Sequence, residues 1–164
     1  MSVPTPDFRT LLDELTAHEV DFIVVGGIGA ALQGAPVVTF DLDIVHSRKP
    51  ENVHRLLAVL QRLGAYYREQ PAKRLAPSEA DLSGPGHHLL MTRAGPLDLL
   101  GAVTKGRVYE DLIAHTVDLR VSPKKRLRVL DLAMLVVLKE ELGRDKDLAA
   151  LPILRRTLQE RGQP

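Results

Sequence analysis

The most constraining feature of the sequence is an apolar segment, residues 37–45, that carries two aspartates, Asp41 and Asp43. Its β-branched residues are typical of a buried strand. Side chains alternate between the faces of a strand, so both aspartates share one face and their apolar neighbours share the other. Adjacent carboxylates repel each other and are costly to bury without a cation. The segment therefore predicts either a divalent-metal site or a strand end at which both acids reach water.

A glycine pair precedes this segment. A β-branched run, residues 21–25, ends at Gly26 and Gly27, and a short helix over residues 28–33 follows. Such a turn lets backbone N–H groups approach a phosphate, and the helix N-terminus adds a partial positive charge. Tight packing explains a glycine pair equally well. The pair forms neither a Walker P-loop nor a Rossmann fingerprint.

A third carboxylate, Asp98, stands alone in a later apolar run. Residues 87–92 and 96–100 predict two strands joined as a hairpin through Arg93-Ala94-Gly95. An isolated acid in such a strand needs a partner if it is buried. If this strand lies beside the one with Asp41 and Asp43, three carboxylates converge, as two-metal phosphoryl transfer requires.

The remaining pattern predicts an α+β (α/β) fold with a small mixed sheet flanked by helices. We expect a first helix over 5–18, a helix from Pro50 to Leu63, an exposed loop over 71–86, a strand over 117–121, a helix from Asp131 to Leu142 and a last helix within 145–161, where Pro152 marks a bend or the true start. The order predicts a single domain, 1–164, with a core over about 20–122 and C-terminal helices over about 130–161.

Composition excludes several classes of protein. The sequence has no cysteine, which excludes disulfides, thiolate metal sites and cysteine nucleophiles. Aromatic residues make up 4% and the net charge is +1, which argue against a base-stacking surface and a broadly basic one. We find neither a secretory leader pattern nor an apolar run long enough to cross a membrane, and expect a cytoplasmic protein without a membrane partner.

The order of three motifs resembles that of the polymerase-β-like nucleotidyltransferase superfamily: Gly26-Gly27, then Asp41-x-Asp43, then the lone Asp98. Within it, the chain is similar to the small bacterial branch that holds the AbiEii-type toxin nucleotidyltransferases and uncharacterised relatives. The resemblance covers residues 20–150. It implies a nucleotidyltransferase fold and an enzyme that passes a nucleoside monophosphate from an NTP to an acceptor hydroxyl on an RNA end, a protein or a small molecule. It also implies Mg²⁺ or Mn²⁺ held by Asp41, Asp43 and Asp98 as catalytic residues.

The resemblance extends to a C-terminal Lys…Arg…Asp segment. It implies that Lys139 faces the nucleotide phosphates and that the residues after it order the edge of the site. A solvated helix end is the alternative for this segment. The implied nucleotide-binding residues are Gly26, Gly27, Thr39, Lys139, Arg144, Lys146 and Asp147.

Three positions depart from the pattern of the relatives. Ile28 stands where many have a phosphate-binding serine, Val37 where an arginine is common, and Ala150 where an acid recurs. The carboxylates are complete, but phosphate contacts are lost. A non-catalytic nucleotide-binding or partner-binding relative, in a toxin–antitoxin or phage-defence system with an antitoxin-like partner, is therefore the alternative.

Other candidate residues are weaker. His87 and His88 lack a third ligand at zinc spacing, and exposed histidines at a loop end explain them better. His46 falls on the strand face opposite the aspartates. The basic run 120–128 is either a contact for RNA or another polyanion through phosphates, or a solvated turn.

Overall fold

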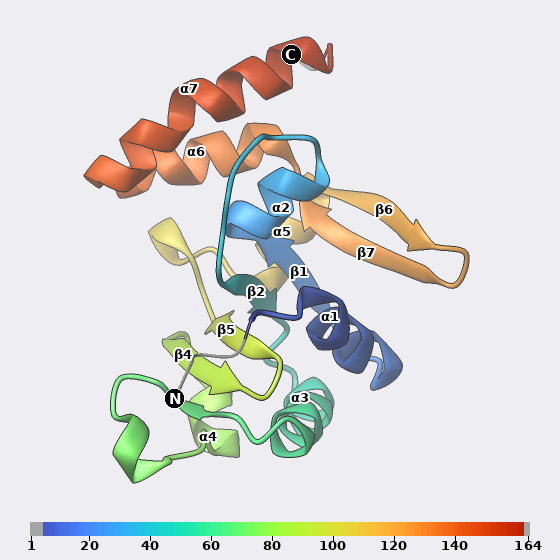
Figure 1. The fold of residues 1–164 in the computed structure, drawn as a ribbon, viewed down its shortest axis with the longest axis vertical. Coiled ribbons are helices and arrows are strands. Elements are labelled where there is room, and N and C mark those ends of the chain that lie inside the picture. Colours follow the sequence, from blue (N-terminus) through green and yellow to red (C-terminus); the bar gives the residue numbers. More distant parts are fainter. Residues whose placement is uncertain (1–4, 163–164) are drawn as a thin grey trace.

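The protein, described here from a computed structural model over residues 5–162, is built on one mixed sheet of seven strands (Figure 1). Their order across the sheet is β3-β4-β5-β2-β1-β7-β6. The strands are β1 Phe22–Val25, β2 Leu42–His46, β3 Tyr66–Tyr67, β4 His87–Thr92, β5 Gly95–Leu100, β6 Thr116–Ser122 and β7 Lys125–Leu130. The predicted α+β class is confirmed.

The central strands are the most apolar part of the sheet. All four residues of β1 are buried, as expected for a strand that is covered on both faces. β1 pairs antiparallel with β2 and parallel with β7, and β2 pairs parallel with β5. β4 and β5 form the predicted antiparallel hairpin.

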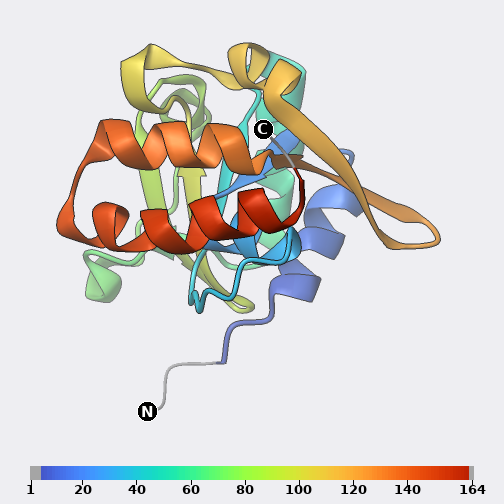
Figure 2. The same ribbon diagram turned by 90° about the horizontal axis from the view of Figure 1, so that it is seen from above.

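Helices cover both faces of the sheet. One core cluster packs α1 and α3 against it, and the other packs α5, α6 and α7 against it. Figure 2 shows α6 and α7 lying side by side. The helices are α1 Phe8–Ala17, α2 Gly26–Leu32, α3 Pro50–Arg62, α4 Glu79–Ser83, α5 Tyr109–Leu112, α6 Leu132–Leu142 and α7 Asp145–Glu160.

Local capping residues fix several helix ends where the sequence predicts them. Pro50 occupies the first turn of α3. The Asp131 side chain accepts a hydrogen bond of 2.7 Å from the backbone N–H of Met134 at the start of α6. Gly143 ends that helix with a left-handed φ of 62°. Pro152 lies inside α7, so it marks neither the start of the helix nor its end.

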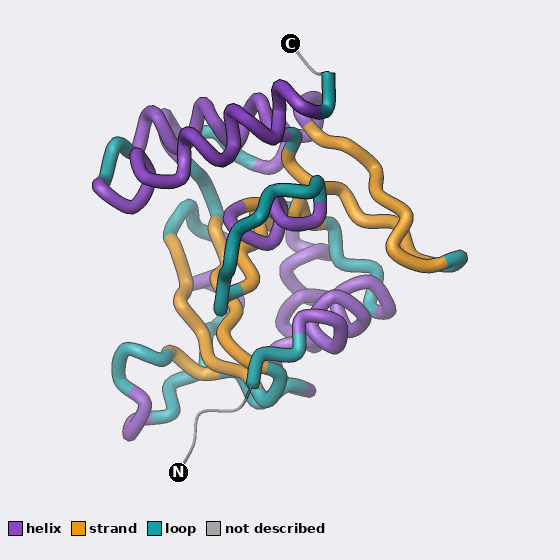
Figure 3. The backbone as a smooth tube through the Cα atoms, turned by 45° about the horizontal axis from the view of Figure 1, so that its top comes forward, coloured by secondary structure: helices purple, strands orange, loops and turns teal. Residues whose placement is uncertain are grey.

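Other predicted boundaries are wrong. The strand predicted from residue 37 begins at Leu42, because β1 ends at Val25 opposite Asp43 and offers no partner to earlier residues. Residues 35–41 instead form a long loop that passes in front of α2 (Figure 3). Helix α2 begins at Gly26, two residues earlier than predicted.

The predicted loop over 71–86 contains a 3-10 turn, Pro71–Lys73, and the short helix α4. Ser78 and Asp81 form a reciprocal capping box at the start of α4, which a search for longer apolar patterns overlooks. The sequence also gave no indication of β3, α5 or β7 as separate elements. Within residues 5–162, the helices are too short or too polar to cross a membrane.

Candidate functional site

Three carboxylates meet where β2 and β5 lie side by side. The parallel register places Asp43 directly opposite Asp98, so their side chains leave the same face of the sheet. Asp41 lies just before β2. One carboxylate oxygen from each of the three residues lies within 4.8 Å of the others, and this is the one such acidic or histidine-containing group among residues 5–162. The predicted convergence of the three acids is thus present.

Asp43 is the most constrained of the three. Burial, followed by the negative charge of Asp98, raises the pKa of Asp43 to about 7. Within the described part of the chain, its buried Oδ1 atom has no hydrogen-bond partner. A carboxylate oxygen in that position is costly unless a cation or a proton satisfies it. Three oxygen donors with one unsatisfied buried oxygen fit a hard divalent cation.

Arg68, directly after β3, extends into this acidic cluster. Its guanidinium Nη1 donates a hydrogen bond of 2.5 Å to Asp98 Oδ1, and Nη2 lies 3.7 Å from Asp41 Oδ2. Nη1 also donates to the backbone carbonyl of Leu90 at 3.2 Å. Sequence reasoning missed Arg68, because a strand of two residues leaves no periodic pattern. The lone arginine after two tyrosines is the only local hint.

The two glycines give space to side chains of the site. Gly26 has a φ of 65°, and a Cβ atom there would overlap the carboxylate of Asp43. A Cβ atom on Gly27 would lie 2.8 Å from Cβ of Thr39. The packing explanation for the pair is therefore borne out. Backbone approach to a phosphate is compatible with it, since both residues form the first turn of α2.

Lys139, near the end of α6, is a second cation whose charge acts on Asp43. Its positive charge acts to lower the pKa of Asp43, against the effect of burial. The ammonium donates a hydrogen bond of 3.0 Å to Asp147, whose side chain is fully buried at the first turn of α7. Arg144 Nε donates to the second carboxylate oxygen of Asp147 at 2.6 Å. Asp147 thus bonds two cationic side chains, and the charge of one of them, Lys139, acts on Asp43.

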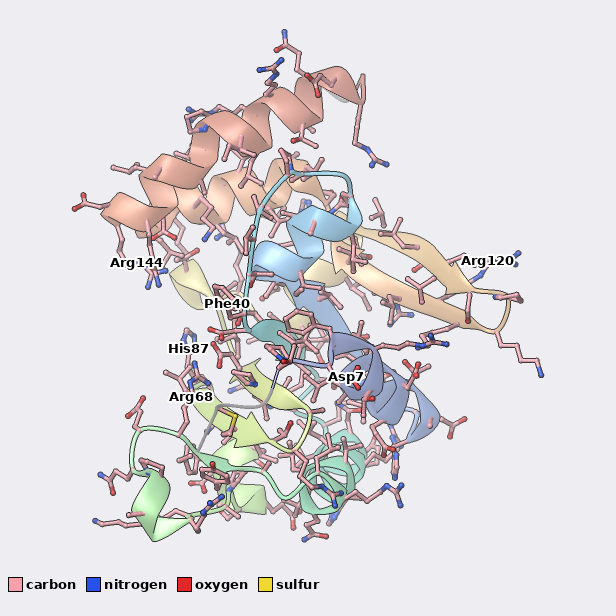
Figure 4. All side chains as sticks on the ribbon, viewed as in Figure 1. Asp7, Phe40, Arg68, His87, Arg120 and Arg144 are labelled. Carbon is pink, nitrogen blue, oxygen red and sulfur yellow. The ribbon has the colours of Figure 1, made fainter. Side chains whose placement is uncertain are left out.

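These hydrogen bonds outweigh the burial of Asp147. Burial alone would raise its pKa, but Arg144 and Lys139 lower it to about 2, so the group stays ionised. Figure 4 shows Arg144 below the start of α7, on the same side of the molecule as Arg68, Phe40 and His87. Cationic side chains therefore flank the acids from two different parts of the chain.

Comparison with known proteins agrees with this arrangement at the level of the fold. No family model matches the sequence, and no curated protein sequence does. Among solved structures, the chain is similar to a Thermotoga maritima protein with a provisional assignment as a nucleotidyltransferase. The TM-score is 0.56 at 20% identity, over 93% of this chain and 91% of the other. The chain has a nucleotidyltransferase-like fold.

Two other predicted nucleotide-binding residues lie in the loop before β2 and on the first turn of α7. The Thr39 hydroxyl donates a hydrogen bond of 3.2 Å to the backbone carbonyl of Asp41 and so restrains the loop that carries the first acid. Lys146 is exposed on the first turn of α7, with no ion pair to any residue of the described range.

The histidines form no part of the acidic cluster. His46 is buried on the opposite face, as predicted, and its Nε2 lies 2.9 Å from the carbonyl of Leu82. His87 is exposed, in line with the prediction, and contacts the carbonyl of Ala102. His88 corrects the same prediction, because it is buried in β4 and its Nδ1 lies 2.8 Å from the hydroxyl of Tyr67.

Proposed function

We propose that the protein is a metal-dependent nucleotidyltransferase that moves a nucleoside monophosphate from an NTP to an acceptor hydroxyl. The meeting of Asp41, Asp43 and Asp98 within 4.8 Å, with one oxygen of Asp43 unsatisfied among the described residues, carries the proposal. The nucleotidyltransferase-like fold supports it. The closer assignment to the AbiEii-type branch rests on the sequence resemblance.

The three carboxylates would hold Mg²⁺ or Mn²⁺, the hard cations that oxygen donors select. When bound, such an ion lowers the pKa of the attacking hydroxyl and offsets negative charge on the phosphate oxygens. Asp43 contributes the buried oxygen, and Gly26 leaves room for its carboxylate. Asp41 and Asp98 complete the donor set from either side.

The chain's own groups then handle the proton and the phosphates. The acceptor oxygen forms a bond to the α-phosphorus, the bond to the bridging oxygen of the β-phosphate breaks, and pyrophosphate leaves. The acceptor proton passes to the carboxylate of Asp98, which acts as general base. Lys139 and the first-turn N–H groups of α2 bind the phosphates. Asp147 positions Lys139 for this task through their hydrogen bond of 3.0 Å.

The direct test is transfer of label. The protein is incubated with each labelled NTP in turn, with Mg²⁺ or Mn²⁺ and with total RNA or cell lysate. We expect label to move to one class of acceptor with the native protein and not with Asp43→Asn. Absence of transfer from every NTP by folded protein that binds Mn²⁺ would remove the catalytic proposal.

The second candidate is a non-catalytic relative that binds nucleotide or an antitoxin-like partner. One observation favours it: Ile28, where relatives have a phosphate-binding serine, is buried and packs into the core instead. Asp98→Asn separates the candidates. An enzyme should keep much of its NTP affinity and lose transfer by about 10²-fold or more, the scale of general-base help. A binder should show no transfer even before substitution.

A further inference from the structure

The antiparallel ribbon of β6 and β7 has one apolar and one charged face. Val129 and Leu127 are buried in the core, while Asp118, Arg126 and Arg128 are exposed. The register pairs Asp118 with Arg128 and Arg120 with Arg126, and side chains of directly paired residues leave the same face. The ribbon extends beyond the helices, with its turn far from α6 and α7 (Figure 1).

Repulsion between like charges destabilises the charged face of the ribbon. Arg120 lies directly opposite Arg126, and like charges at paired positions destabilise an antiparallel ladder. Lys124 adds a third exposed cation at the turn. Within residues 5–162, none of these three side chains has an ion-pair partner. Residues 116–128 contain five Lys or Arg and one acid, Asp118, in a chain whose net charge is only +1.

The ribbon lies at the end of the sheet opposite the acidic cluster. β7 runs parallel to β1, and β1 ends just before Gly26, which lies beside Asp43. The β6–β7 turn leads into the first residue of β7, so it lies at the opposite end of these two strands from Asp43. Figure 4 shows Arg120 on the far side of the molecule from Arg68. A ligand on the ribbon therefore cannot be the reacting group itself.

We propose that this face of the ribbon binds the phosphate backbone of a polynucleotide and anchors a nucleic-acid acceptor away from its reacting end. The inference rests on the proposed function, because it names the class of acceptor. Arginine suits the task, since its planar guanidinium donates paired hydrogen bonds to phosphate oxygens. A phosphate between Arg120 and Arg126 also relieves their repulsion.

A polynucleotide fits this face better than a membrane does. Stable binding to a bilayer surface needs buried apolar area as well as cations, because each cation near an anionic surface contributes only about 1 kcal/mol. The apolar face of the ribbon is instead used in the core through Leu127 and Val129, which leaves Val121 as its one exposed large apolar side chain. RNA and DNA share the backbone chemistry, and the experiment separates them.

The test measures binding without NTP, in an Asp43→Asn background, so that it does not depend on transfer. Fluorescently labelled bulk tRNA and a labelled DNA duplex are titrated at several salt concentrations. The variant is Arg120→Ser/Lys124→Ser/Arg126→Ser. Its matched control, Lys73→Ser/Arg155→Ser/Arg156→Ser, removes the same charge from exposed positions in the Pro71–Lys73 turn and on α7. All six side chains are exposed, and thermal melting checks that both variants fold.

We expect the ribbon variant to bind tRNA about tenfold more weakly or worse at low salt, with the slope of log affinity against log salt reduced by about 2. The control should change affinity by less than about twofold. Tighter binding of tRNA than of the duplex would identify RNA as the ligand, and the reverse would identify DNA. Either result supports the anchor.

Four results would overturn it. Equal losses in both variants would mean that only net charge matters. Unchanged tRNA and DNA binding would mean that the ribbon is a solvated turn, and binding of anionic vesicles that only the ribbon variant loses would identify a membrane contact. If the native protein transfers label to RNA while the ribbon variant keeps its KM, the anchor fails and the proposed function stands. If tRNA binds through the ribbon but no label moves to any acceptor, the anchor stands and the proposed function fails.

Discussion

At the scale of single residues, Asp43 links the electrostatics of the site to pH. Its pKa is raised to about 7 by burial and by Asp98. Between pH 4 and 7 the folded protein therefore holds a proton that the unfolded chain releases, and metal-free stability falls as pH rises across that window. Above pH 7 the group is ionised in both states and the dependence ends.

Metal binding should follow the same proton. A cation must displace the proton from Asp43, so Mn²⁺ should raise the melting temperature more at pH 8 than at pH 6. At a hundredfold excess over Kd, the added stability is about 2.7 kcal/mol. Thermal melts with EDTA or Mn²⁺ measure it. Asp43→Asn should abolish the shift and Asp145→Asn, at an exposed position on the first turn of α7, should keep it. An equal shift at both pH values would contradict the role of Asp43.

Arg68 should affect metal-free and metal-bound protein in opposite directions. Its guanidinium offsets the charge of Asp98 and Asp41, so Arg68→Gln should lower the melting temperature in EDTA. The same variant should enlarge the increase that Mn²⁺ causes, since the acids lose a competing cation. Arg156→Gln, which breaks an exposed pair on α7, is the matched control and should change neither. If Arg68→Gln lowers both the melting temperature in EDTA and the increase caused by Mn²⁺, Arg68 mainly orders the three carboxylates.

At the scale of elements, the joint between α6 and α7 depends on one buried side chain. Asp147 is bonded by Lys139 and Arg144, and losing it leaves both without their partner. We expect Asp147→Asn to lower the free energy of unfolding by about 1–3 kcal/mol at pH 7. Urea titration measures it, with Asp145→Asn as control.

The pH dependence of that loss has a defined sign. The folded pKa of Asp147 is lowered to about 2, so its stabilisation is complete above the unfolded pKa near 4 and is lost as pH falls toward 2. The difference between native protein and Asp147→Asn should therefore shrink between pH 5 and 3. A constant difference would mean that packing, not charge, holds the joint.

Elements with local determinants could be predicted from sequence, and those that need a distant partner could not. Asp131 begins α6 through a side-chain cap and Gly143 ends it through its left-handed backbone, and both contacts are local. By contrast, β3 exists only because Tyr66 and Tyr67 pair with β4, and β7 carries alternating arginines that conceal a strand. The same distinction holds in the site: the acids could be predicted from their apolar surroundings, but Arg68 reaches them only through β3.

At the scale of the whole molecule, stability should be uneven across the sheet. β2 and β5 are central and buried, whereas β6 is an edge strand with an exposed face. Amides of β2 and β5 should therefore exchange with deuterium much more slowly than those around the β6–β7 turn. Peptide-resolved exchange by mass spectrometry measures this. Equal protection in both regions would mean that the ribbon is part of the rigid core.

The parallel pairing of Asp43 with Asp98 would make cation binding at the proposed metal site a readout of strand alignment. Side chains alternate along β5, so a slip of one residue would place a leucine opposite Asp43 and turn Asp98 to the other face. A misaligned chain would keep its helix and strand content, and circular dichroism would not detect the error. A loss of Mn²⁺ affinity would detect the error, so a Mn²⁺ titration would be a sensitive quality check on refolded or redesigned versions of this chain.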